Sequence, residues 1–420
     1  MVKKSSLLIQ VLIALTLAII IGGLSSPDSV IFGISYIKLF GFLGQLFLNA
    51  LTLLVVPLVG SSIVNGISQM GKDQSFRRLG AKTFFFYILT TFLAVLTGLL
   101  MVNLIKPGTY MTAPAASSAT APLLSAAPQN HMEVLGQIFL KLIPINVFEA
   151  ASQGNMLGII FFALLFGFAL AKIESNASDH VMNVIKGIFY TLMRMTHFLM
   201  KAMPLGVFFL VTKAIAMRGL GSIESLLYFF MTVLVGLAAF MFIILPLFLR
   251  IMGLNPWRHL RAMAPALLTA FSTSSSAATL PITMDCVEKR AGVSNRICSF
   301  VVPLGTSINL SGSALYECVA VLFIAQVFGF EMSILHQAII VILSLLTSMG
   351  VAGIPSGSLV AILIILNAMG FPAEGLALIL PVDRILDMCR TTVNVFSDAS
   401  CAVLVAHTEG EKVLEVRNNP

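Results

Sequence analysis

Charged and polar side chains recur along the last apolar segment of the chain, over residues 383–398. Positions 3, 4, 7 and 11 residues after the first share one face, because an α-helix turns once in about 3.6 residues. The members of this polar stripe are Asp387, Arg390, Thr391, Asn394 and Asp398. Each charge would cost about 2.5–3.5 kcal/mol if it faced lipid, so the stripe must face a polar interior. Salt bridging alone needs one acid and one base, and the additional carboxylate, amide and hydroxyl groups therefore favour binding of a charged substrate or an ion.

A second polar motif, GTSINLSGS at residues 305–313, interrupts another apolar segment. A small cation that sheds its water needs several oxygen ligands, typically carboxylate, amide and backbone carbonyl groups. Asn309, Asn394 and Asp398, together with backbone carbonyls near Gly305, supply such a set. The two segments together predict a site for a small cation.

Two clusters of small polar residues each interrupt an apolar stretch of roughly 30–40 residues, which is too long for one membrane span. The clusters lie at residues 272–279 and 348–358. Unpaired backbone groups in lipid cost several kcal/mol each, so these breaks must be buried or line a wet cavity. One such run would be equally typical of close helix packing. Two matched runs, each followed by a polar helix, predict re-entrant helical hairpins in two repeats, which is the pattern of a transporter's binding site.

The composition indicates the class of protein that must position these residues. Hydrophobic residues make up 58% of the 420 residues and charged residues 10%, whereas soluble domains have about 45–50% and about 25%. The chain is therefore predicted to be an all-α polytopic membrane protein. The net charge of +7 is explained by cytoplasmic loops near anionic lipid, so no nucleic-acid partner is expected. Five cysteines without a CxxC pair argue against a disulfide framework or a structural zinc site.

The distribution of basic residues predicts the orientation in the membrane. Lys3 and Lys4, a group at 72–82 and a group at 250–261 alternate sides consistently if both termini are cytoplasmic. Further apolar stretches are expected at about 36–68, 79–105, 134–173, 180–218 and 222–252, with Pro57, Pro144 and Pro204 interrupting three of them. Short termini and the absence of large insertions favour the plasma membrane of a bacterium, its inner membrane.

The motifs together resemble the dicarboxylate/amino acid:cation symporter family, which includes glutamate transporters. They are the Ser-rich hairpin ending in Leu-Pro, PLG-x-x-INxxG, the AGIPSGS hairpin tip and LDMxRTxVNVxxD, and they lie within residues 270–400. The resemblance implies eight transmembrane helices plus two re-entrant hairpins, inverted repeats, a homotrimer and elevator-type transport. It implies that residues 1–257 are mainly scaffold, that segment 79–105 joins a transport core at 258–410, and that 411–420 is a cytoplasmic tail.

The resemblance also implies roles for individual residues in binding an acidic substrate. Arg390 would pair with the distal carboxylate, and Asp387 would hold the ammonium group. Thr391 and Asn394 would complete the polar pocket. The hairpin tips would contact the main carboxylate and close over it, through Ser275, Ser276, Ile354, Pro355 and Gly357.

Three cation sites are implied by the resemblance. One would use Gly305, Asn309, Asn394 and Asp398, and a second would use Ser307 with carbonyls of Ser348, Met349 and Val351. Tyr87, Thr90 and Thr91 match a third, where Ser311 replaces an aspartate that much of the family has. The loss of this carboxylate should weaken sodium binding there.

Glu317 matches a carboxylate that proton-coupled glutamate transporters have. Desolvation favours the protonated form of a buried carboxyl, so Glu317 is predicted to carry a proton. The alternative is a structural carboxylate satisfied by nearby hydroxyls.

The predicted function is import of glutamate or aspartate, coupled to sodium and/or protons, with membrane lipid as surroundings and no other cofactor. A C4-dicarboxylate or a neutral amino acid is the nearest alternative substrate. Asp387 argues against the first because a plain dicarboxylate has no ammonium, and Arg390 argues against the second because it would stay unpaired. From another class, an anion channel would need a continuous ring of pore-lining residues. The sequence contains neither an HExxH nor a GxSxG motif, so an enzyme is not expected.

Overall fold

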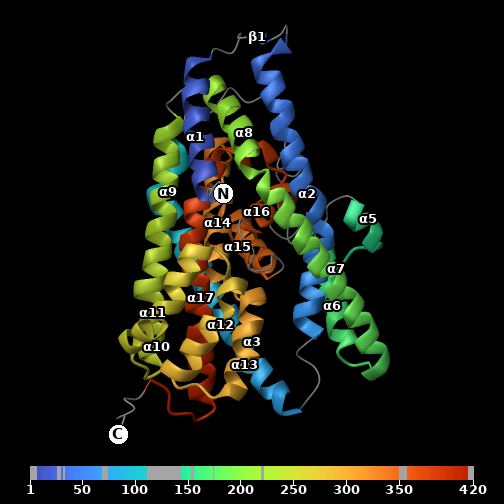
Figure 1. Cartoon of the computed structure of the whole chain (residues 1–420), viewed down its shortest axis with the longest axis vertical. Coiled ribbons are helices and arrows are strands. Elements are labelled where there is room, and N and C mark those ends of the chain that lie inside the picture. The colour runs from blue at the N-terminus through green and yellow to red at the C-terminus, as the bar shows by residue number, and fades with distance from the viewer. Residues whose placement is uncertain are drawn as a thin grey trace, which may run out of the picture.

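The structure is a computed structural model that describes residues 7–25, 30–31, 34–68, 74–110, 143–152, 156–173, 175–218, 222–349 and 357–414. These residues form an elongated bundle of helices (Figure 1). The two short strands, β1 (Val30–Ile31) and β2 (Ile34–Ser35), pair antiparallel between the first two helices. The all-helical class predicted from composition is confirmed.

One group of helices packs around α2. Its helices are α1 (Leu7–Leu24), α2 (Tyr36–Ser68), α5 (Val147–Ser152), α6 (Met156–Leu170), α7 (Ser175–Lys201) and α8 (Met203–Arg218). α2 contacts α6, α7 and α8, and α1 lies along α8. The expected interruption at Pro57 is wrong, because α2 continues through this residue. Neighbouring helices pack on α2, and the Ser61 hydroxyl donates to the Pro57 carbonyl at 2.7 Å.

The other group surrounds α17 (Leu376–Thr408), which runs through the middle of the bundle. It contains α3 (Gln74–Ile105), η1 (Pro107–Tyr110), α9 (Ser222–Ala239), the π-helical turn η2 (Phe240–Ile244), α10 (Leu245–Ile251), α11 (Pro256–Thr273), α12 (Ser276–Asp285), the π-helical turn η3 (Cys286–Arg290), α13 (Asn295–Ile308), α14 (Ser311–Val327), α15 (Ile334–Ser348), α16 (Gly357–Met369) and η4 (Ala373–Gly375). α9 packs on α3, α14 and α17. Within the stretch expected at 222–252 and assigned to the scaffold, α9 therefore lies against α17, the helix that carries the polar stripe.

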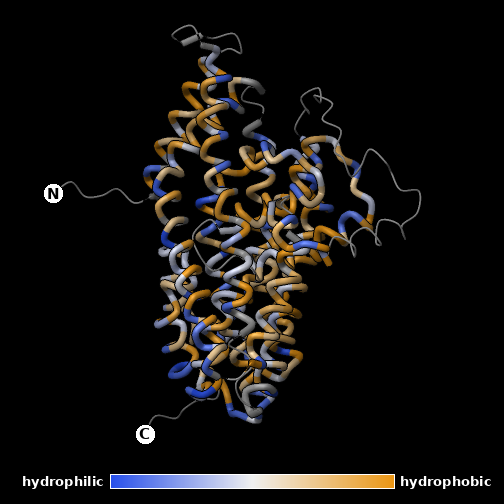
Figure 2. Tube along the Cα trace, turned by 90° about the vertical axis from the view of Figure 1, so that its right-hand side faces the viewer, coloured by the Kyte–Doolittle hydropathy of each residue, from blue (hydrophilic) through white to orange (hydrophobic). Residues whose placement is uncertain are grey.

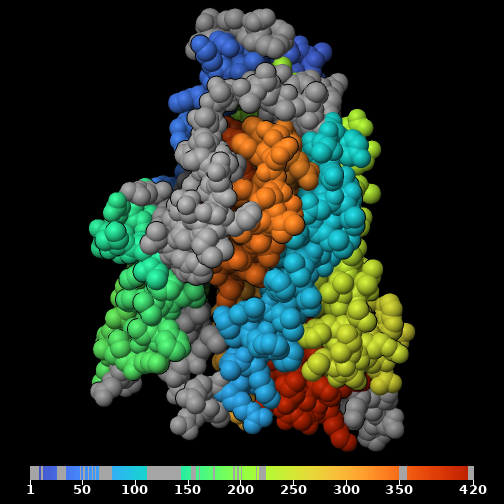
Figure 3. Space-filling model, turned by 180° about the vertical axis from the view of Figure 1, so that it is seen from behind, coloured from blue at the N-terminus to red at the C-terminus, as the bar shows by residue number. Residues whose placement is uncertain are grey.

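Apolar side chains cover the outside of the bundle as well as its core. Three helical stretches of the described chain are long and apolar enough to cross a membrane, namely Arg78–Tyr110, Glu224–Ile251 and Asn295–Val327. Hydrophobic residues extend over most of the tube in Figure 2. Figure 3 shows α15 (orange) lying along α3 (cyan-blue) on the surface, consistent with their contacts. On α3 the side chains of Phe85, Ile88 and Phe92 are exposed, as expected of a helix that faces hydrocarbon.

The first predicted break is confirmed at residues 274–275, between α11 and α12. Ser274 adopts the left-handed conformation, with φ 51° and ψ 35°, and ends α11. Ser275 begins α12 as its N-cap, and its hydroxyl accepts a hydrogen bond from the Ala278 amide at 3.3 Å. α11 and α12 pack on each other and both contact α17. The Ser-rich run thus turns the chain back on itself at the stripe.

The GTSINLSGS motif also breaks a helix, as predicted. α13 ends at Ile308 and α14 begins at Ser311, so Asn309 lies between them. The first amides of α14 have no acceptor within their own helix and are capped from α17. Asn394 Oδ1 accepts from the Gly312 amide at 2.8 Å and from the Ser313 amide at 3.2 Å. This cap fixes the broken helix against the polar stripe of α17.

The end of the described chain folds back on the same group of helices. Leu414 donates its amide to the Ala291 carbonyl at 2.8 Å and accepts from Arg258 Nη1 at 3.2 Å. Glu411 accepts from the Ser294 amide at 2.9 Å. Val413 and Leu414 are buried. Residues 411–414, expected to begin a tail, are therefore packed onto the ends of α11 and α13, and 415–420 lie outside the described residues.

Glu409 pairs with Lys82 on α3, and Arg78 lies 3.5 Å from the same carboxylate oxygen. The hydrogen bond from Lys82 holds the pKa of Glu409 below its usual value. A depressed pKa stabilises the fold above the unfolded value of about 4.3, and this gain is lost as pH falls through the folded pKa. We therefore expect Glu409→Gln to lower stability by up to about 1 kcal/mol at pH 7, and to have no effect at a pH low enough to protonate this carboxyl in the folded protein. Thermal unfolding at both pH values measures this, and an equal loss at both would contradict the ion pair as its cause.

Candidate functional site

The polar stripe predicted from spacing lies on α17 as a single face turned into the protein. Asp387, Arg390, Thr391, Asn394 and Asp398 are each at most 5% exposed. Their helix is unbroken from Leu376 to Thr408, so the assumed period of about 3.6 residues holds throughout. The prediction that the stripe faces the interior is confirmed.

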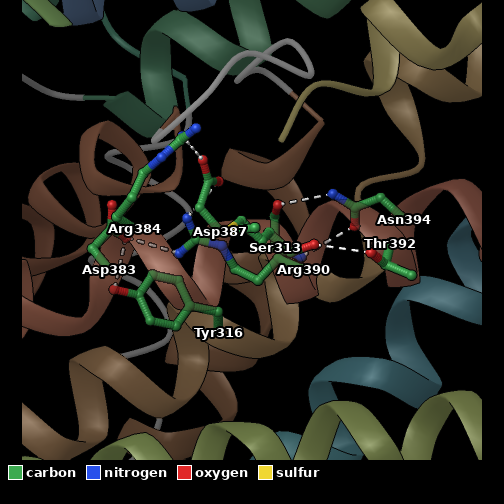
Figure 4. Close-up of polar contacts among 9 residues, drawn as sticks. Ser313, Tyr316, Asp383, Arg384, Asp387, Arg390, Thr392 and Asn394 are labelled. Carbon is green, nitrogen blue, oxygen red and sulfur yellow. Dashed lines mark hydrogen bonds and ion pairs between the residues drawn. The ribbon is translucent and has the colours of Figure 1, made fainter. Parts of the chain in front are cut away.

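Arg390 is the centre of a buried ion-pair cluster (Figure 4). Its Nη1 donates to Asp383 Oδ1 at 3.0 Å, and its Nη2 donates to Asp387 Oδ1 at 2.8 Å. The guanidinium lies over the ring of Tyr316, 3.9 Å from the centroid. A desolvated cation over an aromatic face gains about 2 kcal/mol. Both terminal nitrogens of Arg390 are thus engaged, while its Nε has no partner among the described residues.

Asp383 and Tyr316 belong to this site, although the sequence did not assign them to it. The Tyr316 hydroxyl donates to Asp383 Oδ1 at 3.1 Å, the same oxygen that accepts from Arg390. Asp383 precedes Arg390 by two helical turns, so helical periodicity alone would have placed it on the stripe. Tyr316 comes from α14, and no local pattern predicts its place under the guanidinium.

The remaining candidate substrate residues of the described chain lie on α17 and at the starts of α12 and α16. Asn394 Nδ2 donates to the Ser313 hydroxyl at 3.1 Å, and Gly357 is buried at the start of α16. Ser276 is buried at the start of α12, where its Oγ has no partner among the described residues. Ser275 caps that helix. Ile354 and Pro355 lie outside the described residues.

Asn309 brings together three hydroxyls, two from α3 and one from α14. Its Oδ1 accepts from Thr90 at 3.2 Å, from Thr91 at 3.1 Å and from Ser311 at 3.0 Å. Ser311 and Thr91 are also 3.2 Å apart through their hydroxyl oxygens. Thr90, Thr91 and Ser311 of the implied third cation site therefore share one buried cluster, in which Ser311 supplies a neutral oxygen, whereas the Tyr87 hydroxyl donates to the Val301 carbonyl.

Asp398 adjoins this cluster from α17. Its Oδ1 accepts from Asn309 Nδ2 at 2.9 Å, and its buried Oδ2 has no partner among the described residues. A Cβ on Gly305 would lie 2.6 Å from Asp398 Oδ1 and 3.1 Å from the Tyr87 hydroxyl. Only glycine permits this approach of carboxylate to backbone. The arrangement places a buried carboxylate, which has one oxygen without a partner among the described residues, against the backbone at Gly305, and a carboxylate oxygen is a ligand that hard cations prefer.

The second implied cation set lies at two helix ends. Ser307 is in the last turn of α13, and Ser348 and Met349 end α15. An apolar cavity of about 160 Å³ is lined by Met349, by Ile308 and by Tyr87 and Thr91 of α3, among others. It has no charged lining residue, so it is not where an acidic substrate binds. Val351 lies outside the described residues.

Glu317 is completely buried on α14. Its Oε2 accepts from the Thr347 hydroxyl of α15 at 2.9 Å, and its Oε1 has no hydrogen-bond partner among the described residues. The Ser358 hydroxyl of α16 also interacts with this carboxylate. Two hydroxyls satisfy only part of a carboxylate, which can accept about four hydrogen bonds.

Comparison with known proteins decides the family. A sequence model described as "Sodium:dicarboxylate symporter family" matches residues 7–408. The chain belongs to the sodium:dicarboxylate symporter family. The resemblance inferred from the motifs is thus confirmed, and membership makes this chain a membrane protein of a transporter family.

Several relatives of this family member match nearly the whole chain. The "Proton/glutamate-aspartate symporter" of Escherichia coli (strain K12) is 34% identical over 410 residues, covering 97% of this chain and 93% of the relative. The "Proton/sodium-glutamate symport protein" of Bacillus subtilis (strain 168) is 36% identical over 369 residues, covering 88% and 86%. A "C4-dicarboxylate transport protein" of the same Bacillus strain is 32% identical over 409 residues, covering 97% and 94%.

Proposed function

We propose that this chain is a secondary-active symporter that imports an acidic amino acid, glutamate or aspartate, coupled to sodium and/or protons. The observation that carries the proposal is the fully buried Arg390, held by two carboxylates of its own helix. A buried guanidinium flanked by exchangeable partners suits a ligand with a carboxylate at its distal end. Two relatives are named as a glutamate-aspartate symporter and a glutamate symport protein, and these names support the same substrate class.

In the proposed complex, each group of the substrate has a partner in the site. Arg390 exchanges one of its aspartates for the distal carboxylate, and Asp387 accepts from the ammonium group. Thr391 and Asn394 supply a hydroxyl and an amide on the same face of α17. Because α12 begins at the first hairpin tip, the amides of its first turn suit the main carboxylate. Gly357 likewise begins a helix, α16.

Coupling ions are proposed to bind next to this pocket. Asp398, Asn309 and the carbonyls near Gly305 and Asn394 hold one sodium ion. Helix-end carbonyls of Ser348, Met349 and Val351 with Ser307 hold another. The cluster of Tyr87, Thr90 and Thr91 has only neutral oxygens of its own, and binds sodium weakly. Glu317 carries a proton.

Ser311 gives a test of the weak cation site. Ser311→Asp introduces a carboxylate at a position whose hydroxyl lies 3.0 Å from Asn309 Oδ1 and 3.2 Å from the Thr91 hydroxyl, and we expect it to steepen the dependence of uptake on sodium, raising the Hill coefficient toward one additional ion. The measurement is initial uptake over a sodium series at fixed pH. Ser299→Asp is the matched control, because Ser299 is exposed on α13 and its hydroxyl bonds the Arg296 carbonyl, outside this cluster. An unchanged Hill coefficient in Ser311→Asp would contradict the proposed site.

The packing of the helices supports a proposal for their arrangement in the membrane. We propose eight transmembrane helices, with the α11–α12 and α15–α16 pairs as re-entrant hairpins of two inverted repeats. Residues 258–410 with 79–105 form a transport core, and the packing of α9 adds 222–251 to it. This core moves as an elevator against the α1–α2 group, which holds a homotrimer. Both termini face the cytoplasm of a bacterial inner membrane.

A C4-dicarboxylate is a second candidate substrate, for a specific reason. The Asp387 carboxylate, which would repel an anion, is already neutralised by two guanidiniums, because Arg384 Nη1 lies 3.2 Å from its Oδ2. A relative is named as a C4-dicarboxylate transport protein. Asp387 therefore excludes such substrates less strongly than its charge alone suggests.

Uptake by proteoliposomes tests which substrate is carried. The purified full chain, given inward sodium and proton gradients, should take up radiolabelled L-aspartate or L-glutamate, with unlabelled acidic amino acids competing better than succinate and much better than serine. Uptake of succinate alone would support the second candidate. No uptake of any of these compounds would contradict the proposed function.

A further inference from the structure

Arg384 is a second guanidinium at the candidate substrate site, on the same helix as Arg390. Its side chain is only 11% exposed, and its Nη1 lies 3.2 Å from Asp387 Oδ2. Figure 4 shows it above Asp387, on the side away from Arg390. Its Nε is buried without a partner among the described residues. Helical periodicity explains why the two groups meet, since residues three apart are neighbours on a helix.

The formal charges of the four ionised side chains around Asp387 cancel. The two carboxylates Asp383 and Asp387 face the two guanidiniums of Arg384 and Arg390, so the cluster has no formal net charge. Each oxygen of Asp387 has its own guanidinium: Oδ1 accepts from Arg390 and Oδ2 from Arg384. Before substrate binds, the Asp387 carboxylate, which is proposed to bind the substrate ammonium, is therefore already bonded to both Arg390 and Arg384.

Substrate binding changes these two contacts differently. When Arg390 turns to a substrate carboxylate, Oδ1 of Asp387 becomes available to an ammonium group. Oδ2 keeps Arg384, which is not needed for the distal carboxylate. A retained cation reduces the attraction of Asp387 for an ammonium and also its repulsion of an anion. Its effect on affinity thus has opposite signs for amino acids and for dicarboxylates that lack the ammonium.

We propose that Arg384 is a specificity-determining positioning residue, which shares the Asp387 carboxylate and thereby sets the preference between acidic amino acids and C4-dicarboxylates. The inference rests on the proposed function and deepens it. A purely structural role accounts poorly for this pair, because a nearly buried ion pair contributes little net stability and leaves the Arg384 Nε unsatisfied. A structural role would also affect both substrate classes equally.

The test compares inhibition constants in proteoliposomes, with radiolabelled L-aspartate as the transported probe and unlabelled L-aspartate and succinate as competitors. In Arg384→Gln we expect the ratio of the succinate constant to the aspartate constant to rise about tenfold over the wild-type ratio, which corresponds to about 1.4 kcal/mol. Arg384→Lys keeps the charge and should keep the ratio near the wild-type value. Arg250→Gln is the matched control, because Arg250 is exposed at the end of α10, and it should leave the ratio unchanged.

Two results would overturn the inference. One is a ratio in Arg384→Gln within twofold of the wild-type ratio, and the other is an equal shift in the Lys and Gln variants. If Arg384→Gln does not yield folded protein, Arg384→Met, which keeps the apolar stem, carries the same expectation. Wild-type protein that transports no acidic amino acid would contradict the proposed function, whereas normal aspartate transport with an unchanged ratio contradicts only the role of Arg384.

Discussion

Arg390→Cys is expected to abolish uptake of aspartate and glutamate while admitting neutral amino acids such as serine. The guanidinium is fully buried, so a distal carboxylate entering the variant would be desolvated without a counter-charge. Removing one partner of a buried charge pair costs about 3–5 kcal/mol, and affinity for acidic substrates should fall at least about a hundredfold. Serine has no distal carboxylate that needs a counter-charge. The introduced cysteine is shorter than Arg390, so it leaves room for serine beside Tyr316. Competition against labelled substrate in proteoliposomes measures both changes.

The matched control is Met388→Cys, which introduces the same thiol on a half-buried position of α17 outside the stripe. It should retain acidic amino-acid uptake. Because Arg390→Cys leaves Asp383 and Asp387 without their shared partner, its folding is checked by thermal unfolding before binding is compared. Unchanged affinity for aspartate and glutamate in folded Arg390→Cys would contradict the assigned role.

Glu317→Gln is expected to remove the contribution of a proton gradient to uptake. The wild-type protein should take up substrate faster when the vesicle interior is alkaline, because protons then leave Glu317 on the inside and reload it outside. Glutamine keeps an acceptor for the Thr347 hydroxyl but carries no exchangeable proton. Substrate binding in Glu317→Gln should change less than the response to the pH gradient, since Glu317 makes no hydrogen bond to the Arg390 cluster among the described residues and the Arg390 charge acts on it only through space.

Initial uptake rates with and without an imposed pH gradient, at constant sodium, give the measurement. Glu331→Gln is the matched control, because Glu331 is exposed just before α15 and should keep the wild-type response. Acceleration that persists in Glu317→Gln would assign the proton to another group and return Glu317 to the alternative of a structural carboxylate held by Thr347.

The polar stripe could be predicted because two constraints act on it at once. Helical spacing fixes which residues share a face, and the cost of charges in lipid fixes where that face must point. Neither constraint reports which atoms meet across helices. The position of Tyr316 under Arg390, and the cap of α14 by Asn394, depend on how α14 packs against α17.

The helix breaks were predictable for a similar reason, since a cluster of small polar residues within an apolar run is typical of an interrupted or closely packed helix. The Ser-rich run marked the break, and the left-handed residue at its centre is Ser274. Proline marked two of the three predicted interruptions, because α8 begins at Met203 beside Pro204 and Pro144 lies in non-helical chain before α5. The third was wrong, since α2 continues through Pro57.

Long-range packing was the part that sequence patterns did not contain. The segment 222–251 looks like any other apolar span, yet α9 packs beside α3 and α17. The contacts of Leu414 and Glu411 with the ends of other helices are likewise set by tertiary structure. A short polar ending is locally typical of a free tail.

The central claim is that transport of an acidic amino acid is thermodynamically coupled to cations, and accumulation in proteoliposomes tests it most directly. Vesicles preloaded with unlabelled aspartate at the external concentration are given labelled aspartate and a sodium gradient, a proton gradient, both or neither. We expect net aspartate to accumulate inside above the external concentration when either gradient is imposed, and not when both are absent. Aspartate that only equilibrates under every gradient, as through a channel, would contradict the account.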